Sequence, residues 1–148
     1  FIANTLYNHP LSLSLYNLNN SKDNIKRLQK AIVFEGEKGP LQYASLFGEE
    51  NDISVACCGS SLAKPQLELL IESGAKEIII AFDKQFKEIG DAEFKSWKAK
   101  LIKLNKKYSS YALISFLFDK KGILKYKSSP IDEGKEKFLE LFKERIIL

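Results

Sequence analysis

Short apolar runs alternate with helix-like stretches along most of this chain, and that alternation restricts the fold more than any other feature. The apolar runs predict strands at 31–34, 53–56, 77–82 and 111–118. The stretches between and after them predict helices at 40–47, 65–74, 91–108 and from Asp132 onward. Strands that alternate with helices join through right-handed crossovers into a mostly parallel sheet. We therefore expect an α/β fold with a four-stranded, mainly parallel sheet flanked by helices.

Capping residues and apolar periodicity set the expected helix limits. Pro40 lies in the first turn of one helix and Gly48 lies just past its end, which is the usual asymmetry. In 91–108, apolar residues recur at steps of three and four, so they line one helical face. These residues are Phe94, Trp97, Leu101, Leu104 and Tyr108. A short additional strand is expected at 123–126.

The first 30 residues do not follow this alternation of predicted strands and helices. Residues 11–18 alternate weakly, and 21–30 predicts one lead-in helix capped by Ser21. We interpret residues 1–30 as the tail of an upstream region or an N-terminal extension, and 31–148 as the domain. Because the chain begins with Phe1 and contains no methionine, we expect it to be a piece of a longer protein.

Composition excludes several classes of protein. Two adjacent cysteines, Cys57 and Cys58, cannot form a disulfide framework and are too few for a structural zinc site. The opening residues lack the apolar core of a secretory signal, and no apolar run is long enough to span a bilayer. The net charge of +4 is compatible with a nucleic-acid partner but does not require one. A cytoplasmic location without membrane contact is expected.

Polar and acidic residues follow each predicted strand, where an open parallel sheet binds its ligands. Glu35 follows the first strand, Gly59-Ser60 follows the second, Asp83-Lys84-Gln85 follows the third, and Asp119 and Asp132 come after the fourth. Carboxylates that meet at one edge repel each other unless a cation compensates, and Mg²⁺ prefers such oxygen ligands. Any one of these acids is more simply explained as a solvated loop residue, so only their combination points to a metal site.

That combination resembles the Toprim domain of primases and topoisomerases. The resemblance rests on Glu35-Gly36, the glycine-bearing turn at Gly59-Ser60, and the acid of Asp83-x-Gln85 after an isoleucine-rich strand. The segment 129–134 is similar to a Ser-Pro-x-Asp-x-Gly stretch of bacterial and phage DNA primases. The likeness covers the chain from about residue 31 to the C-terminal helix, and it implies a Toprim-like (Rossmann-like) fold.

The chain departs from the primase pattern at three positions. Gly39 stands where primases usually carry an acid, and Ser128 stands where they often carry one. Gln85 replaces the second acid of Asp-x-Asp. Gln85 can still coordinate through its carbonyl oxygen, but without charge. Either Glu37, Glu88 or Asp119 compensates, or the metal site is weakened.

The resemblance implies a role for each matched residue. Glu35 would act as general base or organise the metal-bound nucleophile, and Gly36 would let the backbone turn. Asp83, Gln85 and Asp132 would bind Mg²⁺ or Mn²⁺, without zinc in this part of the protein. The residues expected to bind nucleic-acid or nucleotide phosphates are Lys38, Gly59, Ser60 and Lys84.

Simpler structural interpretations stand beside these roles. Asp132 is equally well placed to cap the last helix, and Lys84 to be a solvated loop cation. Gly59-Ser60 also fits a tight turn, and the cysteines fit small apolar positions at a strand end. A second candidate surface is the lysine-rich face of 91–108, which either follows a phosphate backbone or is merely solvated.

The resemblance implies a fragment of a DNA primase core, which makes RNA primers on single-stranded DNA by Mg²⁺-dependent nucleotidyl transfer. Single-stranded DNA and nucleotides would be its partners, with a replicative helicase as a further partner, and the isolated piece need not be active. The first alternative is a Toprim nuclease. The second is a non-catalytic Toprim-like module that contacts protein or nucleic acid, and an unrelated flavodoxin-like or receiver-like sheet is a third.

Overall fold

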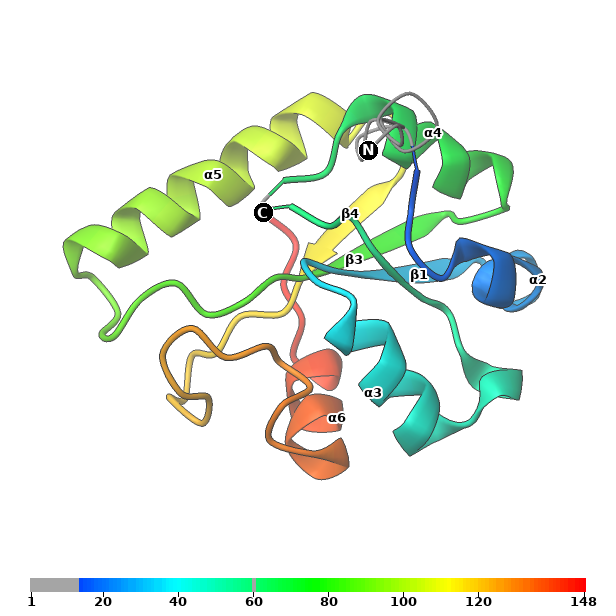
Figure 1. The fold of residues 1–148 in the computed structure, drawn as a ribbon. Helices are drawn as coiled ribbons and strands as arrows, with labels where there is room; N and C mark the ends of the chain where they lie inside the picture. Colours follow the sequence, from blue (N-terminus) through cyan, green and yellow to red (C-terminus); the bar gives the residue numbers. More distant parts are fainter. Residues whose placement is uncertain (1–13, 60) are drawn as a thin grey trace, which may run out of the picture.

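A four-stranded parallel sheet forms the centre of the molecule (Figure 1). The computed structural model describes residues 14–59 and 61–148. The strands, all parallel in the order β2-β1-β3-β4, are β1 (Lys30–Phe34), β2 (Ser54–Ala56), β3 (Glu77–Ala81) and β4 (Leu113–Phe116). The predicted α/β fold is confirmed, and the expected fourth strand is shortened at both ends.

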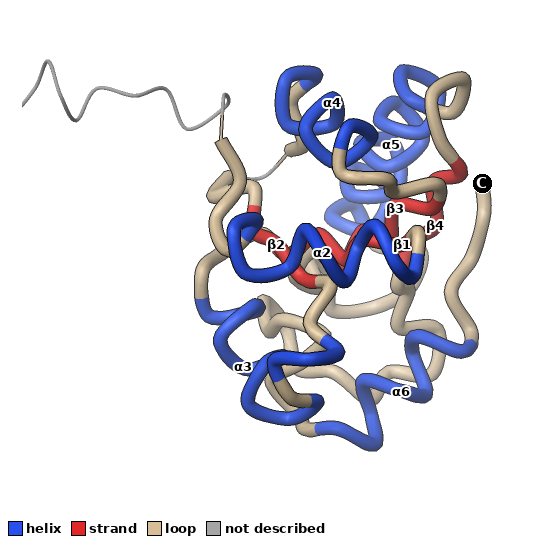
Figure 2. The backbone as a smooth tube through the Cα atoms, turned by 90° about the vertical axis from the view of Figure 1, so that its right-hand side faces the viewer, coloured by secondary structure: helices blue, strands red, loops and turns tan. Residues whose placement is uncertain are grey.

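Helices cover both faces of the sheet and make a three-layer arrangement (Figure 2). α4 (Lys64–Glu72) and α5 (Ala92–Tyr108) lie on one face, and α3 (Lys38–Phe47) and α6 (Lys135–Lys143) lie on the other. α2 (Leu18–Leu28) leads into β1, and a short 3₁₀ helix, Glu49–Asn51, precedes β2. The limits of α3, α4 and α5 lie within two residues of those expected from the sequence.

The core lies between these layers, because the two central strands are apolar on both faces. β1 and β3 bury nearly every residue, as expected for parallel strands covered from both sides. The predicted apolar stripe of α5 packs on one face through Trp97 and Leu101, and α6 packs on the other through Phe138 and Leu141. A cluster of aromatic rings closes one end of the core: Phe86, Phe94, Trp97 and Phe118.

The N-terminal part of the described chain differs from the expectation in its helix start. α2 begins at Leu18, and Ser21 is buried inside it with its hydroxyl donating to the Asn17 carbonyl, so Ser21 is not the cap. Before α2, Tyr16 pairs with Ala56 through two backbone hydrogen bonds and covers the free edge of β2. Much of the weakly alternating 11–18 lies outside the described residues, and the domain division at residue 30 stays a prediction.

Two expectations for the C-terminal third were wrong. Residues 123–126 are a loop rather than a strand, because the N–H groups of Ile123 and Leu124 donate to the Asp119 carboxylate instead of to a neighbouring strand. α6 begins only after Gly134, whose positive φ of 99° starts the helix without a side-chain cap. Asp132 is therefore not the N-cap, and it instead accepts the N–H of Ser129.

A partly buried ion pair fastens the C-terminal segment to the sheet. Arg145 donates to both carboxylate oxygens of Glu77 at 2.6 and 3.1 Å, and Ser115 donates to the same carboxylate. Burial alone would raise the pKa of Glu77, but these hydrogen bonds and the Arg145 charge outweigh it and lower that pKa. Ile146 then pairs with Phe116 beside β4.

Replacing Arg145 by glutamine should lower the free energy of unfolding by about 2 kcal/mol, because a buried carboxylate loses its bidentate partner. Urea denaturation measures this change. Lys121→Gln is the control, because Lys121 pairs with Glu140 and Glu144 on the exposed surface and its loss should hardly move the midpoint. Equal changes for the two variants would contradict a fastening role for Arg145.

Among the described residues, no helix is both long and apolar enough to cross a bilayer.

Candidate functional site at the carboxyl edge of the sheet

Acidic side chains meet where β1 and β3 end. Glu35 directly follows β1, and Asp83 lies two residues after β3, so the parallel register brings them together. The Asp83 N–H donates to Glu35 Oε1 at 3.3 Å. Beside them is a pocket of about 450 Å³, whose lining is Phe34, Gly36, Glu37, Lys38, Asp83, Lys127, Ser129 and Asp132. The structure therefore places Asp83 beside Glu35 and in one pocket with Asp132.

The electrostatics of these acids favour a cation. Burial raises the pKa of Glu35, and the negative charge of Asp83 raises it further, while the Asp83 N–H and Lys100 act in the opposite direction. Burial also raises the pKa of Asp83, and the charge of Asp132 adds to this effect. Half-buried carboxylates with raised pKa values repel one another, and a divalent ion between them would relieve that repulsion.

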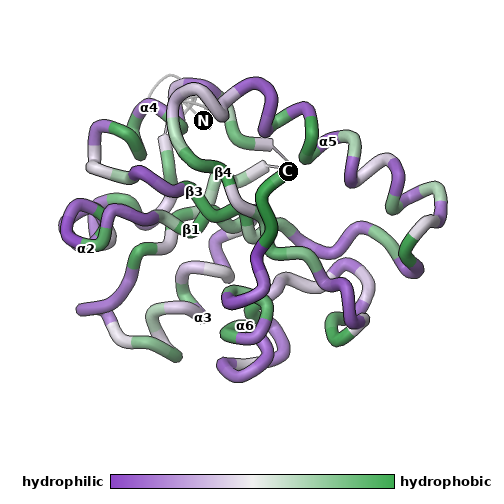
Figure 3. The backbone as a smooth tube through the Cα atoms, turned by 180° about the vertical axis from the view of Figure 1, so that it is seen from behind, coloured by the Kyte–Doolittle hydropathy of each residue, from purple (hydrophilic) through white to green (hydrophobic). Residues whose placement is uncertain are grey.

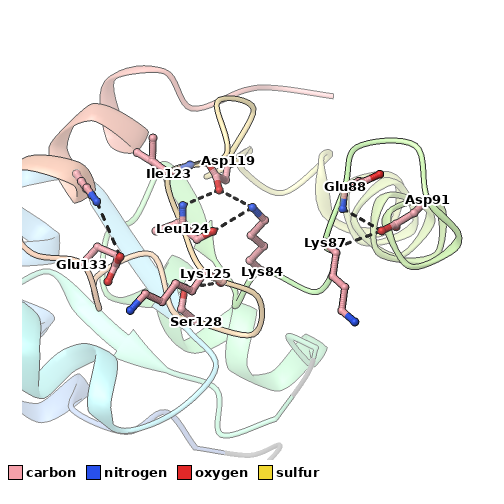
Figure 4. Close-up of polar contacts among 11 residues, drawn as sticks. Lys84, Lys87, Glu88, Asp91, Asp119, Ile123, Leu124, Lys125, Ser128 and Glu133 are labelled. Atoms are coloured by element: carbon pink, nitrogen blue, oxygen red, sulfur yellow. Dashed lines mark hydrogen bonds and ion pairs between the residues drawn. The ribbon is translucent and has the colours of Figure 1, made fainter.

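A loop after β4 carries Asp132 to this edge, and Lys84 holds the loop in place. Lys84 bonds through its backbone to both Lys127 and Ser128. Its ammonium donates to Asp119 at 2.8 Å and to the Leu124 carbonyl at 3.1 Å (Figure 4). The Asp119 carboxylate also accepts the N–H groups of Ile123 and Leu124. The loop is thus fastened directly next to Asp83.

This geometry corrects the interpretation of Lys84 as a solvated loop cation. Lys84 is 8% exposed and Asp119 is 3% exposed. Since the ammonium is engaged with Asp119 away from the pocket, Lys84 is not included among the phosphate-binding groups proposed below. Asp119, considered as a compensating metal ligand, is engaged in the same pair. The sequence did not predict this pair, because its only signals there are a lysine after a buried strand and an acid 35 residues away.

The other predicted site residues are distributed unevenly. Lys38 is exposed and lines the acidic pocket together with Glu37. Gln85 lines a different pocket with Glu93, Ser96, Trp97 and Lys100, so the structure does not bring it together with Asp83 and Asp132. Glu88, considered as a compensating acid, is exposed, and its N–H donates to Asp91 at the start of α5.

In the turn after β2, the structure describes the two cysteines and Gly59. Ser60 lies outside the described residues, and Gly59 accepts a hydrogen bond from the Cys57 thiol through its carbonyl. Burial raises the pKa of Cys57 to about 11, so this thiol stays protonated, in agreement with the apolar role predicted from the sequence. The phosphate-binding role of Gly59 stays a prediction.

Two glycines of the first loop behave differently. Gly36 has open space around it and no left-handed φ, so the turn that presents Glu35 does not depend on glycine there. Gly39 is packed so closely that a Cβ atom would lie 2.3 Å from Cγ of Phe34. An acid at this position is therefore excluded by packing, which explains one departure from the primase pattern.

The donor set fits a small oxygen-ligand site of two carboxylates. Asp83 and Asp132 line one pocket together with the exposed Glu37, and Glu35 lies beside Asp83. Within 14–59 and 61–148, no cluster of three or more histidine, cysteine, aspartate or glutamate residues is arranged to hold a metal ion. Mg²⁺ is commonly bound by one or two carboxylates together with water and substrate phosphates, so two carboxylates suffice for weak binding.

Comparison with known proteins identifies the class of this fold. The chain has the Toprim-like fold found in bacterial DNA primase catalytic cores. The Aquifex aeolicus primase (zinc-binding and RNA polymerase domains) is 26% identical, with a TM-score of 0.62 over 93% of this chain and 31% of that one. A DnaG primase catalytic domain bound to single-stranded DNA is 19% identical, with a TM-score of 0.64 over 93% of this chain and 41% of that one.

Among curated proteins, the chain is similar to the SPbeta prophage-derived uncharacterized protein YorJ of Bacillus subtilis (strain 168). The two are 34% identical over 152 residues, which cover 98% of this chain and 40% of YorJ. The chain thus spans less than half the length of this relative. No protein-family model matches the chain.

Proposed function

We propose that this chain is the Toprim part of a DNA primase-like protein, which makes RNA primers on single-stranded DNA by metal-dependent nucleotidyl transfer. The observation that carries the proposal is the meeting of Glu35, Asp83 and Asp132 at the carboxyl edge of a Toprim-like sheet. Asp83 and Asp132 would bind Mg²⁺ or Mn²⁺, which stabilises charge on a phosphoryl group during displacement. The similarity to primase cores, one of them bound to single-stranded DNA, supports a nucleic-acid partner.

Other residues of the chain would accept the proton and bind the substrate phosphates. Glu35 has a raised pKa and lies beside Asp83, so it is suited to accept the proton of the attacking hydroxyl. Lys38 and Lys127 line the same pocket as two positive charges that would hold substrate phosphates. Gln85 would act outside the metal site, since it faces the neighbouring pocket.

Metal binding tests the acidic site directly. We expect calorimetry with Mn²⁺ to show saturable binding to the chain, and Asp83→Asn or Asp132→Asn to weaken it by about tenfold or more, because each removes one of two charged ligands. Asp23→Asn is the control, since Asp23 is exposed on α2. Without metal, Asp83→Asn should also be slightly more stable than the wild type at neutral pH, because it removes a half-buried charge that Asp132 repels.

The reaction itself is tested in the intact protein that contains this chain. Incubation with single-stranded template, nucleotides and Mg²⁺ should yield primers, and Glu35→Gln should abolish them while leaving the fold unchanged. Loss of template in place of primers would indicate the nuclease alternative.

A non-catalytic module is the second candidate, and two observations favour it. Gln85 lies apart from the acidic pocket and Gly39 leaves no room for an acid, so the site has fewer charged ligands than the primase pattern implies. Absence of saturable Mn²⁺ binding to the wild-type chain would establish this candidate in place of the proposed enzyme.

A further inference from the structure

The positive charge of this chain is concentrated on one helix. α5 contains six lysines and one glutamate, a net charge of +5, whereas the whole chain has a net charge of +4. The remaining residues together are therefore slightly acidic. The α5 lysines are Lys95, Lys98, Lys100, Lys103, Lys106 and Lys107. In the described part of the chain, none of them forms an ion pair, so their charge is uncompensated.

Helical spacing divides these lysines into two sets. Lys100, Lys103 and Lys107 are three and four residues apart, so they form one row, which we call the α5 row. With a rise of 1.5 Å per residue, the α5 row extends for about 10 Å along the helix. The other set, Lys95, Lys98 and Lys106, lies toward the opposite side of the exposed surface. Polar segments recur along α5 in the hydropathy view (Figure 3).

The α5 row begins close to the acidic site, in the neighbouring pocket that Lys100 lines together with Gln85. The Lys100 ammonium lies 5.8 Å from the centre of the Phe82 ring, and Phe82 directly precedes Asp83. The charge of Lys100 also acts on Glu35. From there α5 runs back along the sheet toward the start of β4 (Figure 1). The row therefore leads away from the pocket that holds Asp83.

The second lysine set lies on the side of α5 that is next to the C-terminal residue. Asn105 is seven residues after Lys98 and so lies on the same side of α5. Its side chain donates to the carbonyl of Leu148, so the C-terminal residue lies beside this side. The two sets thus carry equal charge on the same helix, but it is Lys100 of the α5 row whose charge acts on Glu35.

We propose that the α5 row binds the sugar-phosphate backbone of a nucleic-acid strand that extends from the acidic pocket. The identity of this occupant rests on the proposed function. Lysine ammonium groups are compact charges that bind phosphate without reading sequence, so the row positions a strand rather than selecting one. Charge complementarity with a polyphosphate chain accounts for a row of unpaired lysines that starts next to Glu35.

Two triple variants test this assignment. Lys100, Lys103 and Lys107 are changed to glutamine in one variant, and Lys95, Lys98 and Lys106 in the other, so both lose three charges from the same helix. Fluorescence anisotropy measures binding of a labelled oligothymidylate as a function of KCl concentration, with EDTA present. Glutamine keeps the helix propensity close to that of lysine, and circular dichroism verifies folding.

The α5-row variant should lose about tenfold or more in affinity at low salt, and its slope of log K against log salt should fall by about 2, since each single-strand phosphate contact contributes about 0.7. The control variant should change affinity much less. Equal losses in the two variants, or no saturable binding by the wild-type chain, would overturn the proposal. Displacement of the oligonucleotide by polyglutamate at matched charge would instead assign the row to an acidic protein.

This experiment is independent of the metal site. Because EDTA removes divalent ions, Asp83→Asn should bind the oligonucleotide at least as well as the wild type. Failure of Mn²⁺ binding would refute the proposed metal site without changing the anisotropy result, and loss of row-dependent binding would refute the α5 row alone.

Discussion

Replacing Lys84 by methionine should lower the free energy of unfolding by about 3–5 kcal/mol, because it leaves Asp119 as a buried charge without its partner. Methionine keeps most of the side-chain volume, so the loss reports the charge rather than a cavity. Asp119 would retain only the N–H groups of Ile123 and Leu124. Urea denaturation monitored by the fluorescence of Trp97 measures the change.

The same variant should also weaken Mn²⁺ binding. The Asp119 carboxylate accepts the N–H groups of Ile123 and Leu124, and the backbone of Lys84 bonds to residues 127 and 128. These contacts connect the buried pair to the loop that carries Asp132. Loosening that loop separates Asp132 from Asp83. Lys87→Met is the matched control, because Lys87 is exposed and its ammonium lies over the Tyr126 ring, 5.2 Å from the ring centre. A loss below about 1 kcal/mol for Lys84→Met would mean that solvent replaces the pair.

The effect of Lys84→Met should depend on pH. Burial alone would raise the pKa of Asp119, but the bonds from Lys84, Leu124 and Ile123 outweigh it and lower that pKa. A carboxyl with a lowered folded pKa contributes stability above its unfolded value, about 3.9, and loses it as the pH falls through the folded value. The difference between wild type and Lys84→Met should therefore shrink on acidification below about pH 4.

Much of the fold was predictable because its signals are local. The continuous apolar strands β1 and β3 and the periodic stripe of α5 indicate their structure without knowledge of their partners. The predictions failed where contacts between residues far apart in the sequence, or the backbone conformation of one residue, determine the local structure. Asp119 captures the N–H groups that a strand at 123–126 would need, and the positive φ of Gly134 delays α6. Neither effect is visible from periodicity.

The candidate site was predictable only in part, for a related reason. The rule that acids at carboxyl ends of parallel strands converge grouped Glu35 with Asp83, which lie together, and the resemblance added Asp132, which lines the same pocket as Asp83. The rule cannot tell which way a side chain turns after a strand, so it also included Lys84 and Gln85. Lys84 turns toward Asp119, and Gln85 turns toward Trp97 and Lys100. Three consecutive residues, Asp83, Lys84 and Gln85, thus face the acidic pocket, the loop after β4 and α5, respectively.

Packing also limits how far the site can be restored to the primase pattern. Gly39 is buried in the first turn of α3, against the ring of Phe34 at the end of β1. Phe34 in turn contacts the ring of Phe138 from α6. A larger residue at position 39 must displace either the start of α3 or a ring that joins two layers of the molecule. The absence of an acid here is thus a consequence of the aromatic core.

Gly39→Asp should consequently destabilise the chain by about 3 kcal/mol or more, since an overpacked contact alone costs about 1–3 kcal/mol and the aspartate adds a charge in a buried position. Gly39→Ala, which adds only the Cβ, should cost about 1–3 kcal/mol. Gly36→Ala, three residues earlier, is the matched control, because nothing lies within 4 Å of the new Cβ there. Chemical denaturation of the three variants gives the comparison.

A second substitution separates steric overlap from other causes. Phe34→Ala removes Cγ and Cδ1, two of the three atoms that a Cβ at position 39 would overlap, so the double variant Gly39→Ala with Phe34→Ala should lose less stability than the sum of the two single variants. Additive losses would show that the Cβ does not meet Phe34. If Gly39→Asp folds as stably as the wild type and also tightens Mn²⁺ binding, packing does not exclude an acid at this position, and the two-carboxylate description of the site is wrong.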